Sequence, residues 1–254
     1  MQLVADYGPG DLAYAELTQR LALAVPDSVV QLTRVAHADT VAAGFCVARL
    51  ALTDGPPGRI VAHDVRPATG SRDPRMCTGR APGEAWIVGP NAGWSWSFVV
   101  DELAALCHLD VTTGGAQPGP CDGLPVAIAH VARRHPHALW DAVPRSSFQP
   151  VPERVVAFVD AAGDITTTIA EPPGAAGARV EVRIGCISAR AIVTAAGHSI
   201  AAGDLALISG APAWSTRDGS RRSFVGLTVG GGSAAERFAV PPSGTPVGLS
   251  AAGA

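Results

Sequence analysis

The spacing of apolar residues predicts an alternation of strands and helices over the first 140 residues. Apolar positions recur at helical intervals in some segments, while short runs rich in Val, Ile and Leu are typical of buried strands. The pattern predicts helices over 12–25, 39–52, 96–107 and 126–134, and strands over 3–5, 29–33, 59–65, 85–89 and 109–112. Strands alternating with helices indicate an α/β domain with a mostly parallel sheet.

The pattern changes after a proline-rich stretch at 144–153, which we interpret as a linker. Beyond it, short β-type runs separated by turns predict a smaller, mostly antiparallel β domain, with strands over 154–159, 165–169, 179–184, 187–193, 205–208 and 223–229. The predicted domains are therefore 1–147 and 148–243. The last segment, 244–254, is rich in Gly, Ala, Pro and Ser, and a disordered tail is expected there.

Composition narrows the class of protein. The chain has 254 residues, 47% of them hydrophobic, with no apolar stretch long enough for a bilayer and no visible signal peptide, so we expect a soluble, cytoplasmic protein without a membrane partner. A net charge of −3 argues against a nucleic-acid partner. All 19 basic residues are arginine, which excludes Schiff-base lysine chemistry. The five cysteines form no C-x-x-C pair, so no metal site is predicted.

Polar residues follow three of the predicted strands. The first strand ends in Asp6-Tyr7-Gly8, and the segments 60–70 and 86–93 also end in Pro, Gly and small polar residues. In open α/β sheets, ligands bind outside the carboxyl ends of the strands. Three such loops on one sheet edge predict a pocket.

The order of these motifs resembles that of the S-adenosylmethionine hydroxide adenosyltransferase and halogenase superfamily, which includes the fluorinase and the chlorinase. The resemblance covers roughly residues 2–240. It rests on Asp6-Tyr7-Gly8 with Asp11, Pro67-Ala68-Thr69-Gly70, Gly89-Pro90-Asn91-Ala92-Gly93, the turn 160–164 and the segment 223–236.

The resemblance implies a fluorinase-like fold, a homotrimer, and a site between the first domain of one subunit and the β domain of its neighbour. It further implies S-adenosylmethionine as a possible substrate, with no required cofactor. Asp6 would grip a ribose diol, Asp160 an amino-acid end, and Thr69 would supply a pocket hydroxyl. The predicted substrate-binding residues are Tyr7, Asp39, Asn91, Trp94, Asp122, Asp160, Asp164 and Phe224.

Departures from the family pattern concentrate at the predicted site. Arg66 stands where the hydroxide-transferring enzymes have an Asp and the fluorinase a Tyr. Two like charges about 5 Å apart repel by roughly 3 kcal/mol at an effective dielectric of about 20, which disfavours a sulfonium unless a carboxylate such as Asp64 offsets the charge. The family's His-Gly-Arg-Asp segment is replaced by residues 121–124, and a family Asn by Asp164. We therefore predict a refitted pocket.

In that pocket Arg66 would grip an anion or stabilise an oxyanion, with Asp6, Asp64, Asp39 or Asp122 as acid–base partners. The predicted catalytic residues are Arg66, Asp6, Asp64 and Thr69. Plainer interpretations stay open: Asp6 could cap a helix, and Arg66 could form a surface ion pair with Asp64.

Three hypotheses about function follow. The first is an enzyme of bacterial specialised metabolism that converts a small polar or anionic substrate by acid–base or electrostatic catalysis, in a cyclisation or elimination. The second is an S-adenosylmethionine-dependent nucleophilic substitution, as in a hydroxide adenosyltransferase or halogenase. The third is a non-catalytic protein that binds a small molecule.

Overall fold

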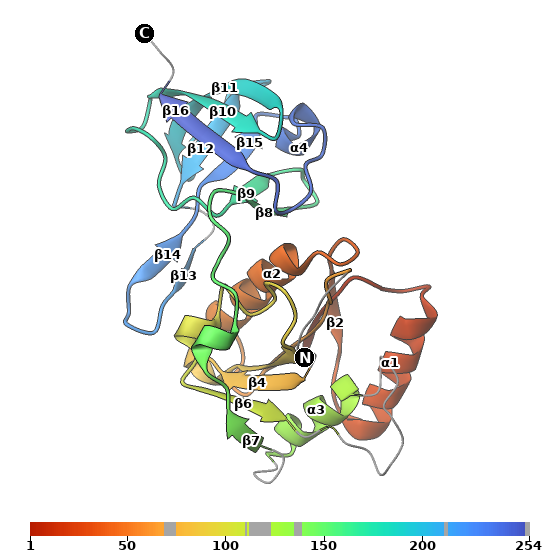
Figure 1. The fold of residues 1–254 in the computed structure, drawn as a ribbon. Coiled ribbons are helices and arrows are strands. Elements are labelled where there is room, and N and C mark those ends of the chain that lie inside the picture. Colours follow the sequence, from red (N-terminus) through yellow and green to blue (C-terminus); the bar gives the residue numbers. More distant parts are fainter. Residues whose placement is uncertain (69–74, 110, 112–122, 135–138, 211–212, 252–254) are drawn as a thin grey trace. The chain divides into compact units, whose positions relative to one another are not determined.

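The computed structural model describes residues 1–68, 75–109, 111, 123–134, 139–210 and 213–251 (Figure 1). The chain divides into two compact units, Met1–Pro150 and Val151–Ala254. The division lies within the proline-rich stretch that the sequence marks as a linker. Each unit is built around its own seven-stranded sheet.

The sheet of the first unit is parallel at one end and mixed overall. Its strand order is β2 (Gln31–Arg34), β1 (Gln2–Ala5), β3 (Ile60–Asp64), β5 (Trp86–Pro90), β4 (Met76–Arg80), β6 (Ala105–Leu109) and β7 (Leu139–Ala142). The first four are mutually parallel, whereas β4 pairs antiparallel with both β5 and β6, and β6 pairs antiparallel with β7. The expectation of a mostly parallel sheet therefore holds for one half only.

Helices cover this sheet on both faces. Side chains alternate along a strand, so neighbouring positions face opposite sides. Leu3 and Ala62 face a core shared with α1 (Leu12–Ala24) and α3 (Gly123–Ala132). The intervening positions face the other side, where α2 (Thr40–Leu52) packs against β1, β3 and β5. The helices α1 and α2 begin and end close to the bounds that the apolar spacing predicts.

The prediction of a helix over 96–107 is wrong. The segment after β5 forms turns, then the 3-10 helix η2 (Val100–Glu102), then β6. Trp96, Phe98 and Val99 are all buried, so the segment has no polar face of the kind that an amphipathic helix needs. β6 ends at Leu109, where the sequence predicted a strand to begin. Strand β4 was not predicted, because Met-Cys-Thr-Gly-Arg lacks a strong β pattern. Two further 3-10 helices are η1 (Pro82–Glu84) and η4 (Arg145–Ser147).

The second unit has the predicted β architecture. Its sheet runs β16 (Val247–Ala251), β10 (Arg179–Ile184), β11 (Ile187–Ala195), β12 (Leu205–Ser209), β15 (Gly226–Val229), β9 (Ile165–Thr167) and β8 (Val156–Val159). Its pairings are antiparallel except for β11 with β12. A separate hairpin joins β13 (Ala213–Ser215) to β14 (Arg221–Ser223), and α4 (Ala234–Arg237) follows β15.

The segment expected to be a disordered tail, 244–254, instead contributes an edge strand. Strand β16 pairs antiparallel with β10 from Val247 opposite Ile184 to Ala251 opposite Val180. Val247 is 3% exposed and fills the core of the second unit, and Leu249 packs against that core. This alternation of apolar residues is hidden by the surrounding Gly, Ser and Ala. Residues 252–254 lie outside the described part of the chain.

Among the described residues, no helix combines the length and the apolar character that crossing a membrane would require.

Candidate functional site at the carboxyl edge of the first sheet

Three parallel strands end at the same level on the first sheet. Ala5 of β1 lies opposite Arg34 of β2 on one side and opposite Asp64 of β3 on the other. The residues that follow each strand therefore leave the sheet next to one another, at the edge where α/β proteins bind ligands. This register brings together the segments 35–37, 6–7 and 65–66.

A cluster of three side chains, here called the Asp64 cluster, joins two of these strand ends. It consists of Tyr7, Asp64 and Arg66. The Tyr7 hydroxyl donates a hydrogen bond of 2.8 Å to Oδ2 of Asp64. Arg66 Nε lies 3.7 Å from Oδ1 of the same carboxylate. The Asp64 side chain is 8% exposed and that of Arg66 is 40% exposed, so the buried carboxyl lies beneath a cation that reaches solvent.

The surroundings of Asp64 favour its protonated form. Burial raises the pKa of the Asp64 carboxyl above its usual value, because a desolvated carboxylate loses its hydration. The Tyr7 hydrogen bond and the positive charge of Arg66 lower this pKa, while the negative charge of Asp6 raises it, and the net effect is an increase. A carboxyl perturbed in this way at a sheet edge is typical of a group that exchanges protons.

Asp6 binds the loop between β2 and α2. Its Oδ2 accepts a hydrogen bond of 2.9 Å from the backbone N–H of Ala38 and lies 3.1 Å from Nδ1 of His37. The carboxylate thus contacts a neighbouring loop, whereas Asp11, at the start of α1, holds the Gly8 N–H at 2.6 Å. Among the described residues, Asp6 accepts no hydrogen bond from the helix that follows it, so the alternative role as a helix cap has no support.

Asp39 and the loop after β5 frame the same edge. Asp39 caps α2, since its Oδ1 accepts from the Ala42 N–H at 2.9 Å. Asn91 follows β5, and its N–H donates to the carbonyl of Arg75. Trp94 is 36% exposed on this loop. Its carbonyl lies against Gly44 of α2, where a Cβ atom would approach that oxygen to 2.2 Å.

His63 lies on the opposite face of β3 from Asp64 and is fully buried. Its ring occupies the space above Gly89, where a Cβ atom would come within 2.3 Å of Nε2, and it packs edge-on against Trp96. Neither ring nitrogen has a hydrogen-bond partner among the described residues. Burial, followed by the charge of Arg66, lowers the pKa of His63 to about 3, so the ring is neutral at physiological pH.

The predicted site residues of the second unit have local structural roles. Asp160 Oδ1 accepts from the N–H groups of Ala162 and Asp164, both at 2.9 Å, and so stabilises its own turn. Phe224 is buried and packs against Trp214 with ring centroids 5.2 Å apart. Asp164 is half-buried in the turn. Two further predicted residues, Thr69 and Asp122, lie outside the described residues.

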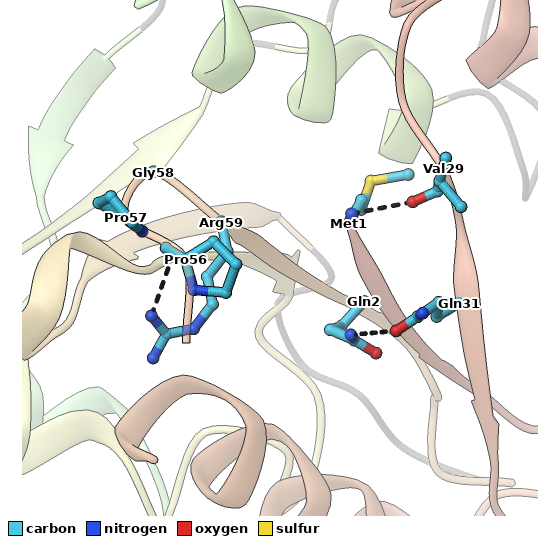
Figure 2. Close-up of a pocket in the computed structure, with 8 residues that line it drawn as sticks. All are labelled: Met1, Gln2, Val29, Gln31, Pro56, Pro57, Gly58 and Arg59. Carbon is cyan, nitrogen blue, oxygen red and sulfur yellow. Dashed lines mark hydrogen bonds between the residues drawn. The ribbon is translucent and has the colours of Figure 1, made fainter. Parts of the chain in front are cut away.

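A hollow of about 330 Å³ lies at the opposite, amino-terminal edge of the sheet, between β1, β2 and the loop before β3 (Figure 2). Several of its polar groups make hydrogen bonds to one another or to the backbone. Gln2 donates to Gln31 at 2.6 Å, and the amino terminus donates to the Val29 carbonyl. Arg59 donates to backbone carbonyls at and beyond the end of α2, those of Leu50, Ala51, Thr53, Gly55 and Pro56.

The described residues contain no group of three or more His, Cys, Asp or Glu side chains that could hold a metal ion. The titratable groups of the described side chains at the carboxyl edge include carboxyl, phenol, imidazole and guanidinium.

Two contacts at this edge were not foreseen from the sequence. These are the Tyr7–Asp64 hydrogen bond and the His37–Asp6 pair, which join residues 57 and 31 positions apart. Aligning the ends of the predicted parallel strands in register would have indicated both, because it places 6–7 between 35–37 and 65–66.

The fold defines a two-unit α/β and β protein, and solved structures share it over their whole length. A structure described as an uncharacterized conserved protein from Thermotoga maritima matches with a TM-score of 0.74 and 18% identity, covering 98% of each chain. A conserved hypothetical protein from Thermus thermophilus matches with a TM-score of 0.63 and 21% identity, again over 98% of both chains. At these identities the likeness concerns the fold alone. No family model matches the sequence, and no curated protein matches it.

Proposed function

We propose that the chain is an enzyme that acts on a small anionic or polar substrate at the carboxyl edge of its first unit, by acid–base and electrostatic catalysis. The observation that carries this proposal is the Asp64 cluster. A buried carboxyl with a raised pKa, a phenol bonded to it and a half-exposed guanidinium meet where parallel strands end. Proton donors and acceptors in such a setting are suited to general acid–base catalysis.

The position of Arg66 is the reason for proposing an anionic substrate. Its side chain is 40% exposed and meets Asp64 through Nε. An arginine presents a planar fork of donors that matches a carboxylate or phosphate, and it remains charged at all physiological pH values. A sulfonium at this edge would meet the same charge, which disfavours S-adenosylmethionine to the extent that the Asp64 carboxyl does not offset it.

The Asp64–Tyr7 pair supplies the proton transfer of an elimination or cyclisation. In an elimination, a base takes the proton from carbon, the C–H electrons form the double bond, and an acid gives a proton to the departing group. Asp64 is suited to that role because burial raises the pKa of its carboxyl. Arg66 would stabilise the negative charge that develops on the substrate.

The test is a binding and turnover comparison with chosen probes. Calorimetry with malonate, inorganic phosphate and S-adenosylmethionine would be run on the wild type, on Arg66→Gln and on Arg80→Gln. Arg80, the last residue of strand β4, is a matched control, because it forms an exposed ion pair with Glu84 of η1. We expect malonate or phosphate binding that weakens about tenfold or more in Arg66→Gln and is unchanged in Arg80→Gln.

Release of adenosine or a 5′-halo-adenosine from S-adenosylmethionine would contradict the proposal and favour the substitution hypothesis. Tight binding of a metabolite that is recovered unconverted would favour the binding-protein hypothesis. We also propose that the chain forms a homotrimer with its site at a subunit boundary. Light scattering during size-exclusion chromatography would measure the number of subunits.

A further inference from the structure

His37 stands at the carboxyl edge with one ring nitrogen against a carboxylate and the rest of the ring in solvent. The distance from Nδ1 to Oδ2 of Asp6 is 3.1 Å. The His37 side chain is 89% exposed, whereas that of Asp6 is 14% exposed. An exposed pair of this kind contributes little to stability.

The loop that carries His37 is held in an uncommon conformation. Ala38 has a φ of +59°, in the left-handed region that non-glycine residues rarely adopt. Its N–H donates to the same Asp6 oxygen that His37 meets. Asp6 therefore fixes both the backbone and the ring, and such local strain concentrates at functional sites.

The strand register places His37 and Arg66 on either side of the Asp6-Tyr7 turn. β1 lies between β2 and β3, and the residues following the three strands start from one level. Two strand spacings separate β2 from β3, which is about 10 Å. A small anion seated above the end of β1 would thus lie between the imidazole and the guanidinium.

We infer that Asp6 and His37 form a carboxylate–imidazole dyad in which Nδ1–H donates to Asp6 and Nε2 is the proton acceptor facing the ligand. The inference rests on the proposed function, since Arg66 would hold that ligand. The substrate proton passes to Nε2, its bonding electrons stay with the substrate, and Asp6 stabilises the resulting imidazolium. This role differs from a grip on a ribose diol, because Oδ2 of Asp6 already meets two donors.

The dyad is tested by the tautomer of His37. Two-bond ¹H–¹⁵N correlation spectra of the histidine-labelled protein at pH about 8 distinguish an imidazole protonated on Nδ1 from one protonated on Nε2. We expect the Nδ1–H form for His37 in the wild type and its loss in Asp6→Asn. Asp11→Asn is the matched control, because Asp11 holds the same turn through Gly8 and not through His37. A wild-type His37 protonated on Nε2, or one unaffected by Asp6→Asn, would overturn the dyad.

A second arm tests whether Nε2 faces the ligand. Malonate should shift the Nε2 resonance of His37 in the wild type, and the shift should disappear in Arg66→Gln. If calorimetry shows Arg66-dependent malonate binding while His37 stays unshifted, the acceptor role is refuted. If malonate does not bind at all, the anion-binding proposal fails, while the tautomer result still decides on the dyad.

Discussion

The two edges of the first sheet each place an arginine near the ends of the parallel strands, and they use it in opposite ways. At the amino-terminal edge, Arg59 donates to five carbonyl groups at or beyond the end of α2. At the carboxyl edge, Arg66 Nε lies 3.7 Å from the Asp64 carboxylate, and the side chain is 40% exposed. The first guanidinium compensates the unpaired carbonyls of a helix end, whereas the second makes no other ion pair with the described residues.

The edge that has the hollow and the edge that has the titratable side chains are different edges of the sheet. The amino-terminal edge has a hollow of about 330 Å³, and its glutamines, amino terminus and arginine make hydrogen bonds to one another or to the backbone. The carboxyl edge gathers a perturbed carboxyl, a phenol and an imidazole. The proposed site is therefore chosen for its titratable groups and not for the volume of a hollow.

The largest expected effect is the loss of stability at acid pH that the buried His63 of β3 causes. A ring whose pKa falls from 6.5 to about 3 on folding stays neutral, whereas the unfolded chain takes up a proton below pH 6.5. The free energy of unfolding should fall by about 1.4 kcal/mol per pH unit from pH 6.5 toward 3 through this group alone. Urea unfolding across that range should show a shallower slope for His63→Leu, and an unchanged slope for the exposed control His198→Leu. Equal slopes in wild type and His63→Leu would refute the neutral ring.

Replacing Arg59 should give the next largest effect. Arg59→Ala leaves carbonyl groups at the end of α2 without a donor, and we expect the free energy of unfolding to fall by about 2 kcal/mol. Arg59→Lys should recover part of this loss, because an ammonium keeps the charge near the helix end with fewer directed donors. Urea titration measures both. A change under about 0.5 kcal/mol in Arg59→Ala would mean that water replaces the guanidinium, and the contrast between the edges would fail.

Asp64→Asn should show a smaller effect with a defined sign. Since the folded pKa of Asp64 is raised above 3.8, its stabilising contribution is complete below pH 3.8 and is lost as pH rises through the folded pKa. The substituted amide would remain neutral, so the variant should gain stability relative to wild type as pH rises from about 4 to 8. Thermal unfolding over this range checks the trend. A variant that loses stability relative to wild type as pH rises would show that Tyr7 and Arg66 outweigh burial.

The smallest expected change in stability belongs to Arg66→Gln. A part-exposed ion pair contributes about 0.2–1 kcal/mol, so the free energy of unfolding should shift by less than about 1 kcal/mol. The same variant should lose most of its affinity for malonate. A loss of stability as large as that of Arg59→Ala would place Arg66 among the structural arginines and weaken the site assignment.

Sequence reasoning succeeded where one periodicity dominates. α1 has apolar residues at helical spacing, and β10 alternates strictly between buried Val180, Val182 and Ile184 and exposed neighbours. It failed where burial erases the periodicity. The segment after β5 buries Trp96, Phe98 and Val99 together, and the pattern was mistaken for a helix.

The candidate site was predicted as a set of residues and not as a set of contacts. Asp6 and Tyr7 were named from the turn after the first strand, and Arg66 with its partner Asp64 from the family resemblance. The structure brings these four to one edge. Their partners depend on register between strands that are distant in sequence, which no local pattern encodes. His37, which meets Asp6 directly, was not among the predicted site residues.

The unbroken register of β1 with both neighbours has a consequence for how this chain can change. Successive side chains of a strand point to opposite faces, so one residue inserted between Gln2 and Ala5 would exchange the sides to which Asp6 and Tyr7 project. The carboxylate would then replace the phenol beside Asp64, and two acids would face each other. Substitutions on the loops can therefore change the side chains at this edge one at a time, whereas insertion of one residue in β1 would change the positions of Asp6 and Tyr7 together.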